Sequence, residues 1–442
     1  MEIEFAEFKK TKDGKILLGQ IIALMKNIHP VEISRDLESK QKLYDKGFKE
    51  IHSFILEPLG IGSISLGFKI QALQAVETIS RKAILCFPEL AGGDSKNFSS
   101  VIKNTIKNNI AVKEIFDFDL FFEDDTKSIF ELCLPTNPID WAEKIWERLF
   151  TELESSVNNW LIFFPLERVS SQSFNLNFDG LYVVNPQDEE FIRNIISSFR
   201  MANLWYFSGL HSDTYNKIIS RENTSWLVCK SFGTVDGSKS SASKKMRTFV
   251  SVLFAHLHKH KLGVLNKSSI KPKDYTIQFS SDEKNTNGNG QASYIGNLFP
   301  PILDDIVITN DIINEIIDWY QRRETLPEDR KNRVNVAAQF INYGINTKEL
   351  EQFIHFFISI DALFGERGDV ERLITEGVRR TFPSDPLWNY KISKLFDLRS
   401  ELVHGGCSSI IDWKDFDKYL THAKSEPLKD VITASLTAFR NI

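Results

Sequence analysis

Hydrophobic residues recur every three or four positions through the last third of the chain, which is the period of amphipathic helices. From about residue 301 onward, no run has the alternation expected of a strand. The pattern predicts helices at 307–320, 334–343, 348–364, 370–382, 388–404 and 428–439. Residues 321–330 are interpreted as a charged connector. Short connections between amphipathic helices favour antiparallel neighbours, so we expect an all-α bundle over residues 301–442.

The middle of the chain differs, because short apolar runs there end at turn residues. The predicted strands are 160–164, 180–184 and 226–229. Helices are predicted at 188–201 and 245–260, and polar loops at 233–245 and 280–292. We expect residues 156–300 to form an α/β region of the kind that could act as a sensor.

The first 155 residues mix both patterns. The spacing predicts helices at 36–56 and 140–155 and a strand at 115–122, whereas 70–85 alternates less clearly. The expected fold class is α+β, in which a mixed α/β N-terminal region precedes an all-α bundle. The expected domains are 1–155, 156–300 and 301–442.

Composition narrows the function classes. The 442 residues carry a net charge of −5, which argues against a protein that coats nucleic acid through overall basicity, although a local basic patch is compatible with it. No apolar run approaches the roughly 20 residues of a membrane span, and the charged N-terminus lacks a signal-peptide core. The four cysteines lie at no zinc-site or CxxC spacing, so we expect reduced thiols in a cytoplasmic protein.

Three weaker patterns do not change this interpretation. His256 and His260 could share one helix face as metal ligands do, but no carboxylate or cysteine lies at a supporting spacing. Asp117 and Asp119 alternate with phenylalanines, as in a strand with one solvated face. The glycines at 60–62 lack the lysine and Ser/Thr of a phosphate-binding loop. We therefore predict no metal and no cofactor.

The most informative segment is the predicted helix 388–404, in which Arg399 lies within the apolar arc of the helical wheel. Apolar residues flank it on both sides, namely Leu395, Leu398 and Leu402 on one and Phe396 and Val403 on the other. A guanidinium in such a position needs a partner, because an unpaired buried cation is costly. Asp361 lies on the apolar face of the predicted helix 348–364 and is the candidate partner. The pair could be a purely structural ion pair, or it could orient a functional arginine.

His404 ends the same helix, directly before Gly405 and Gly406. The carbonyl end of a helix favours an imidazolium, so a histidine there can deliver or accept a proton. Arg399 and His404 have an Arg, four residues, His spacing that is weak by itself. The apolar setting, the helix end and the following glycines make it more specific.

The segment Leu395-Phe-Asp-Leu-Arg-Ser-Glu-Leu-Val-His-Gly405 resembles the signature of HEPN domains, particularly the Apea-like group. The segment 353–364 resembles the other recognisable helix of that family, with Asp361 where Glu would be expected. The resemblance covers about residues 330–442. It implies a helical bundle that dimerises and often acts as a metal-independent endoribonuclease. By position, it implies that Arg399 and His404 are catalytic and that Ser400 and Glu401 support them.

This resemblance implies that the ribose 2′-hydroxyl of RNA is the nucleophile, with His404 as general base or acid and Arg399 stabilising charge on the phosphoryl oxygens. One copy from each protomer of a homodimer would converge on a composite site. A run of cations could contact phosphates beside it or could be a solvated linker. The run comprises Arg322, Arg323, Arg330, Lys331 and Arg333.

Two functions follow as hypotheses. The first is a regulated endoribonuclease, similar to toxins and antiphage abortive-infection effectors, whose first 300 residues sense a trigger such as a phage-derived one. The second is a non-catalytic HEPN module for dimerisation or binding, in which Arg399 is a structural partner of Asp361.

Overall fold

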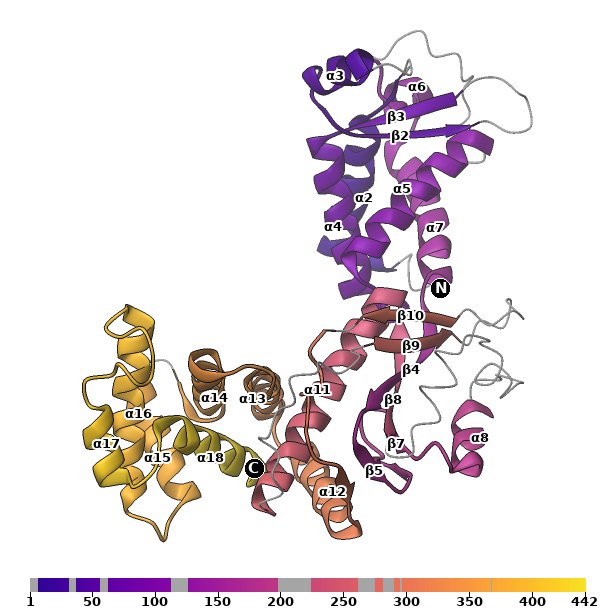
Figure 1. Ribbon diagram of the computed structural model, residues 1–442. Coiled ribbons are helices and arrows are strands. Elements are labelled where there is room, and N and C mark those ends of the chain that lie inside the picture. The colour runs from indigo at the N-terminus through magenta and orange to yellow at the C-terminus, as the bar shows by residue number, and fades with distance from the viewer. Residues whose placement is uncertain are drawn as a thin grey trace. The chain divides into compact units, whose positions relative to one another are not determined.

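The computed structural model describes residues 7–31, 37–55, 63–112, 126–197, 224–260, 275–280, 290–294, 296–366 and 368–442. The chain forms two compact units, shown in Figure 1. The N-terminal unit contains Met1–Asn159 together with the short segment Phe232–Ser238. The C-terminal unit contains Trp160–Ser231 and Lys239–Ile442.

Helices build most of the N-terminal unit. They are α2 (Lys12–Lys26), α3 (Leu37–Asp45), α4 (Ile70–Cys86), the 3-10 helix η1 (Pro88–Leu90), α5 (Ser95–Val112), α6 (Ile129–Cys133) and α7 (Pro138–Ser155). A three-stranded antiparallel sheet accompanies them, in the order β1 (Ile28–Val31), β3 (Ser63–Lys69) and β2 (Phe48–Ile55). Buried side chains of α2, α4, α5 and α7 form one apolar core, in which Trp146 is among the largest.

The predictions for this unit are confirmed in part. The single helix predicted at 36–56 is wrong: α3 ends at Asp45, Gly47 has a φ of +90°, and the chain continues as β2. A glycine is needed for that reversal because other residues rarely adopt such a backbone. The helix predicted at 140–155 is confirmed as α7, and 70–85 is helical as α4. The predicted strand at 115–122, with Asp117 and Asp119, and the glycines at 60–62 fall outside the described residues.

The C-terminal unit begins with a six-stranded sheet. Its strand order is β10 (Gly290–Tyr294), β9 (Tyr275–Ser280), β4 (Asn158–Leu166), β8 (Ser225–Gly233), β7 (Leu181–Val184) and β6 (Phe174–Asn175). The three predicted strands at 160–164, 180–184 and 226–229 are confirmed within β4, β7 and β8. The helix predicted from 188 is α8 (Glu189–Ser197), and the residues after it are not among those described. A parallel pair joins β5 (Val169–Ser171) to β11 (Ile306–Ile308), so the expectation of no strand after 301 is wrong.

The long helix α11 (Val235–Lys259) replaces the polar loop predicted at 233–245. Its first turn is stabilised by Thr234, whose hydroxyl accepts from the Gly237 amide at 3.2 Å and donates to Asp94 Oδ2 at 2.6 Å. A serine-rich stretch looks like a loop because serine hydroxyls compete for backbone groups. Here Ser243 instead donates to the carbonyl of Lys239 one turn earlier, at 2.8 Å, and the helix continues.

After residue 308, the described residues of the C-terminal unit form seven helices. They are α12 (Asn310–Glu324), α13 (Glu328–Asn346), α14 (Glu349–Phe364), α15 (Val370–Thr381), α16 (Leu387–His404), α17 (Phe416–Ala423) and α18 (Pro427–Arg440). All six predicted helices are confirmed with shifted ends, and α17 was not predicted. The charged connector predicted at 321–330 is wrong, because α12 runs to Glu324 and Pro327 caps α13.

α14 is central to the helical part, where it packs against α13, α15 and α18 (Figure 1). Gly344 of α13 allows one of these contacts, since a Cβ there would lie 2.8 Å from the ring of Phe356 on α14. The α+β fold class is confirmed, with antiparallel sheets in the first part of the chain and helices in the last. Among the described helices, none has both the length and the apolar character that a bilayer crossing requires.

Candidate functional site

α16 carries both Arg399 and His404 and is fixed in the bundle by its apolar face. Leu395 and Leu398 are fully buried, and the ring of Phe396 meets that of Phe357 on α14 at a centroid distance of 5.7 Å. Arg399 is half-buried at the margin of this face. Val403, which the helical wheel assigned to the apolar arc, is instead 51% exposed.

The end of α16 exposes His404. Gly405 has a φ of +76°, and the amides of Gly405 and Gly406 both bond to the carbonyl of Glu401, the latter at 2.7 Å. This left-handed cap ends the helix directly after His404. The His404 side chain is exposed and makes no hydrogen bond or ion pair with a described residue. The Glu401 carboxylate is paired with Lys414 at 2.8 Å, which gives it a structural contact near the helix end.

α16 contains a buried ion pair, but Arg399 does not take part in it. Lys391 Nζ donates to Asp430 Oδ1 of α18 at 2.9 Å, and the hydroxyl of Tyr419 donates to Asp430 Oδ2 at 2.8 Å. Lys391 and Asp430 are 8% and 4% exposed. Sequence reasoning missed this pair. The available signal was Lys391 in register with Leu395 and Leu398 on the buried face.

Arg399 and Asp361 lie near each other but do not form the predicted direct ion pair. No hydrogen bond or ion pair joins Arg399 to any residue in the described part of the chain. Burial raises the pKa of the Asp361 carboxyl, and the positive charges of Arg399 and then Arg333 partly oppose this increase. The two side chains therefore influence each other electrostatically, and Arg399 keeps its donors free for another acceptor.

Asp361 lies at the C-terminal end of α14, where two arginines of α13 also converge. Its Oδ1 occupies the space beside Gly365, since a Cβ on that glycine would lie 1.9 Å from this oxygen. Arg333 Nε donates to the Ala362 carbonyl at 2.9 Å, and its Nη2 donates to the carbonyl of Gly365. Arg330 reaches another carbonyl of the same turn at 3.4 Å. These arginines satisfy carbonyl groups that have no partner within the helix.

The remaining cations of the basic run have other partners. Arg323 is buried and donates to Asp179 Oδ2 and Asn335 Oδ1, each at 3.1 Å. Lys331 pairs with Glu324 at 3.1 Å. Arg322 donates to the carbonyl of Arg440 at 3.1 Å. The run is thus divided over α12 and α13, and Arg333 is the member that shares an electrostatic neighbour, Asp361, with Arg399.

The described residues contain no group of three or more His, Cys, Asp or Glu that could hold a metal ion. His256 and His260 do share a neighbour, because both contact Glu315, a carboxylate that their own spacing could not reveal. Among the cysteines, burial raises the pKa of Cys229 to about 12 and also raises that of Cys86 and Cys407. These thiols stay protonated near neutral pH and are poor nucleophiles.

Comparison of the chain with protein-family models, with curated proteins and with solved structures yields no match.

Proposed function

We propose that this protein is a metal-independent endoribonuclease of the HEPN type, with Arg399 and His404 as its catalytic pair. The observation that carries the proposal is the separation of two cations on α16. Lys391 forms the buried structural ion pair, whereas the half-buried Arg399 has no bonded partner among the described residues. A guanidinium without an acceptor is suited to bind one from outside, such as a phosphate.

His404 supplies the group that moves protons. As general base it takes the proton of a ribose 2′-hydroxyl, whose oxygen attacks the adjacent phosphorus. The bond from phosphorus to the 5′-oxygen breaks, and a general acid returns a proton to that oxygen. Arg399 stabilises the negative charge on the non-bridging oxygens. The products are a 2′,3′-cyclic phosphate and a free 5′-hydroxyl, and DNA is inert because it lacks the 2′-hydroxyl.

The helix geometry favours a homodimeric site. Arg399 and His404 are separated by about 140° around α16, so one phosphodiester cannot easily contact both from one chain. General acid and general base also require two proton-transfer groups, and α16 (387–404) holds one histidine. A partner protomer would supply the second. The exposed Val403 and Ile411, at 51% and 74%, are apolar side chains that such an interface would cover.

The proposal extends to regulation. An unrestrained ribonuclease damages its own cell, so we assign the first 300 residues a sensing or restraining role in a cytoplasmic toxin or antiphage effector. A phage-derived molecule is the proposed trigger. Ser400 and Glu401 would support the site beside Arg399, and Arg333 would extend the positive field toward the RNA backbone. This part rests on the resemblance of segments 353–364 and 395–405 to the HEPN family.

The test is cleavage of an end-labelled RNA oligonucleotide by the full chain in EDTA, with the same DNA sequence as a negative substrate. We expect His404→Ala to reduce the rate by about 10²- to 10⁴-fold, which is the usual contribution of a general acid or base. His422→Ala is the matched control, because His422 is another exposed histidine in a nearby helix. Its rate should equal that of the unmodified protein.

Arg399→Ala should also lose cleavage, and its melting temperature must be measured beside it to show that the bundle is folded. RNA left uncut by the unmodified protein, or cut equally by His404→Ala, would reject the catalytic assignment. In combination with dimers in solution, that result would support the non-catalytic dimerisation module.

A further inference from the structure

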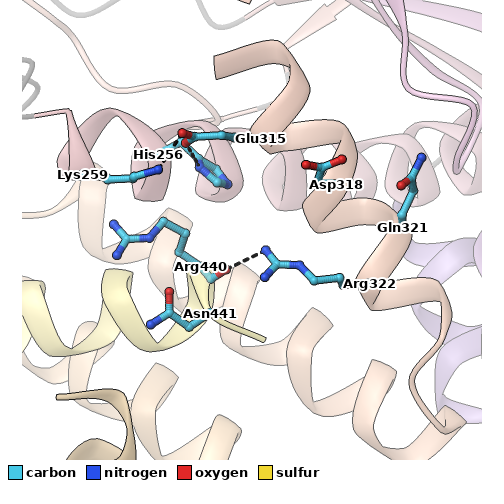
Figure 2. A pocket seen from close by; sticks show the side chains of 8 residues that line it. All are labelled: His256, Lys259, Glu315, Asp318, Gln321, Arg322, Arg440 and Asn441. Carbon is cyan, nitrogen blue, oxygen red and sulfur yellow. Dashed lines mark hydrogen bonds and ion pairs between the residues drawn. The ribbon is translucent and has the colours of Figure 1, made fainter. Parts of the chain in front are cut away.

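A polar pocket in the C-terminal unit lies apart from the proposed catalytic pair along the chain. It has a volume of about 440 Å³ and is lined by residues of α11, α12 and α18 and by Asn441. Figure 2 shows Glu315 extending from α12 toward His256 and Lys259 of α11, and Arg322 directed at the carbonyl of Arg440. The volume falls in the range of sites for small organic ligands.

Glu315 organises one wall of the pocket. Its carboxylate accepts from Lys259 Nζ at 2.6 Å, His256 Nδ1 at 2.8 Å and His260 Nε2 at 3.2 Å. Burial alone would raise the pKa of Glu315, but these hydrogen bonds lower it to about 2. The ionised carboxylate is therefore occupied by two side chains of α11 and by His260 directly after it, and the rest of the pocket lining carries a net positive charge.

His256 places an unpartnered nitrogen in this setting. The side chain is 3% exposed, and Nε2 is buried without a hydrogen-bond partner among the described residues. Because the ionised Glu315 can only accept, Nδ1 carries the hydrogen of that contact. Burial lowers the pKa of His256, although Glu315 opposes this, so the neutral ring presents a lone pair at Nε2. A buried acceptor of this kind needs a donor.

Arg440 supplies the matching unpartnered cation. Its backbone carbonyl accepts from Arg322, but its guanidinium has no hydrogen bond or ion pair within the described part of the chain. Burial lowers the pKa of this guanidinium, and Glu315 opposes the decrease. The pocket lining holds Lys259, Arg322 and Arg440 against two acids, Glu315 and Asp318, which leaves one positive charge in excess when the histidine is neutral.

We propose that this pocket binds the phosphate group of a small phosphate monoester. The phosphate oxygens accept from the guanidinium groups of Arg440 and Arg322, and a phosphate hydroxyl donates to Nε2 of His256. A phosphate monoester carries the negative oxygens that the two arginines require. As its monoanion, it also has the hydroxyl donor that the lone pair of His256 Nε2 requires. The organic part fills the volume that a bare phosphate would leave.

Binding should therefore involve one proton shared between ligand and His256. The groups facing His256 are Glu315 of α12, Lys259 of its own helix and Arg440 of α18. When the ligand arrives as a dianion, its charge favours protonation of the imidazole, so the complex takes up a proton from solution. Affinity is then higher at pH 6 than at pH 8.

The experiment is calorimetric titration of the full chain with ribose 5-phosphate, inorganic phosphate and ribose, in two buffers of different ionisation enthalpy. We expect saturable binding of ribose 5-phosphate, at least tenfold weaker binding of inorganic phosphate, none of ribose, and proton uptake at pH 8. Arg440→Gln should weaken binding at least tenfold. Arg379→Gln, which removes an exposed arginine of α15, should leave it unchanged.

Several outcomes would overturn the assignment. They are no binding at millimolar concentration, equal losses in both arginine variants, and equal affinity for inorganic phosphate and the monoester. His256→Gln, with its melting temperature checked, should abolish the proton uptake. The inference does not depend on RNA cleavage: His404→Ala should bind ribose 5-phosphate as the unmodified protein does, and Arg440→Gln should keep any ribonuclease activity.

Discussion

Two cations of α16 lie about two helical turns apart and are held in different ways. Lys391 is buried in the bundle, where its ammonium donates to Ser425 Oγ and is neutralised by the Asp430 carboxylate, which also accepts from the Tyr419 hydroxyl. Arg399 lies at the margin, where solvent or a ligand can reach it. The energetic consequences of removing each charge should differ accordingly, because only the first leaves a buried partner unpaired.

Asp430→Ala should therefore destabilise the bundle strongly. Removing this carboxylate leaves the Lys391 ammonium buried without its counter-charge, which typically costs about 3–5 kcal/mol. The measurement is the free energy of unfolding in urea. Asp417→Ala, on the exposed face of α17, is the control and should stay within about 0.5 kcal/mol of the unmodified protein. A small effect of Asp430→Ala would show that the buried pair is not coupled to stability as described.

Asp361 should make stability depend on pH in the opposite direction to most carboxylates. Its pKa in the folded state is raised, so the folded protein binds this proton more tightly than the unfolded chain. The resulting stabilisation is fully present below the ordinary carboxyl pKa of about 4 and is lost as the pH rises through the folded-state value.

The variant Asp361→Asn removes the cost of burying an ionised carboxylate at this position. We expect its melting temperature to exceed that of the unmodified protein at pH 7, with the difference shrinking toward pH 4. Asp417→Asn should show no such trend. A lower melting temperature of Asp361→Asn at pH 7 would mean that attraction to Arg399 outweighs burial.

Among the elements, those with a strong local pattern could be predicted from the sequence. The strands β4, β7 and β8 are apolar runs bounded by turn residues, and the bundle helices have clear amphipathic spacing. The helix predicted at 245–260 is confirmed as the second part of α11. Its first part could not be predicted from composition, because the side chain that supports the first turn, Thr234, is itself bonded to Asp94, far away in sequence. Such a contact leaves no local signal.

The same limit applies to the candidate sites. Arg399 and His404 were identified because both lie in one helix with a distinctive end. The partners of Lys391 and His256 could not be identified in this way. Asp430 lies 39 residues from Lys391 and Glu315 lies 59 residues from His256, each in another helix. The prediction that Arg399 lies near Asp361 is correct, but the predicted direct ion pair is wrong. A helical wheel gives the direction of a side chain and not its distance from another helix.

The end of α16 depends on Gly405. Its φ of +76° is in the left-handed region, and a Cβ there would meet no other atom, so the cost of substitution is conformational alone. Gly405→Ala should lower the free energy of unfolding by about 1 kcal/mol. Gly405→Asn should cost less, because asparagine tolerates this conformation. Urea unfolding of the two variants distinguishes them, and equal losses would contradict a purely conformational cost.

On the scale of the whole molecule, the two units share one chain in an unusual order. The N-terminal unit is completed by Phe232–Ser238, which comprises the end of β8, Thr234 and the first turn of α11. Within that unit Gly92 and Gly233 pack backbone to backbone, since a Cβ on Gly233 would lie 1.9 Å from the Gly92 carbonyl oxygen. The Thr234 amide donates to the same carbonyl at 3.2 Å. Neither glycine can be replaced without moving this crossing.

This contact determines where the chain can be truncated without unfolding the first unit. A truncated protein that ends near residue 159 would lack residues 232–238, which complete the first unit. A fragment that begins at residue 160 would contain these residues without the unit against which they pack. If either truncated protein were insoluble, the cause would be the loss of this contact between segments, and the result would say nothing about the activity of either unit. Autonomy of the first unit is better assessed by grafting 232–238 onto its end through a short flexible tether.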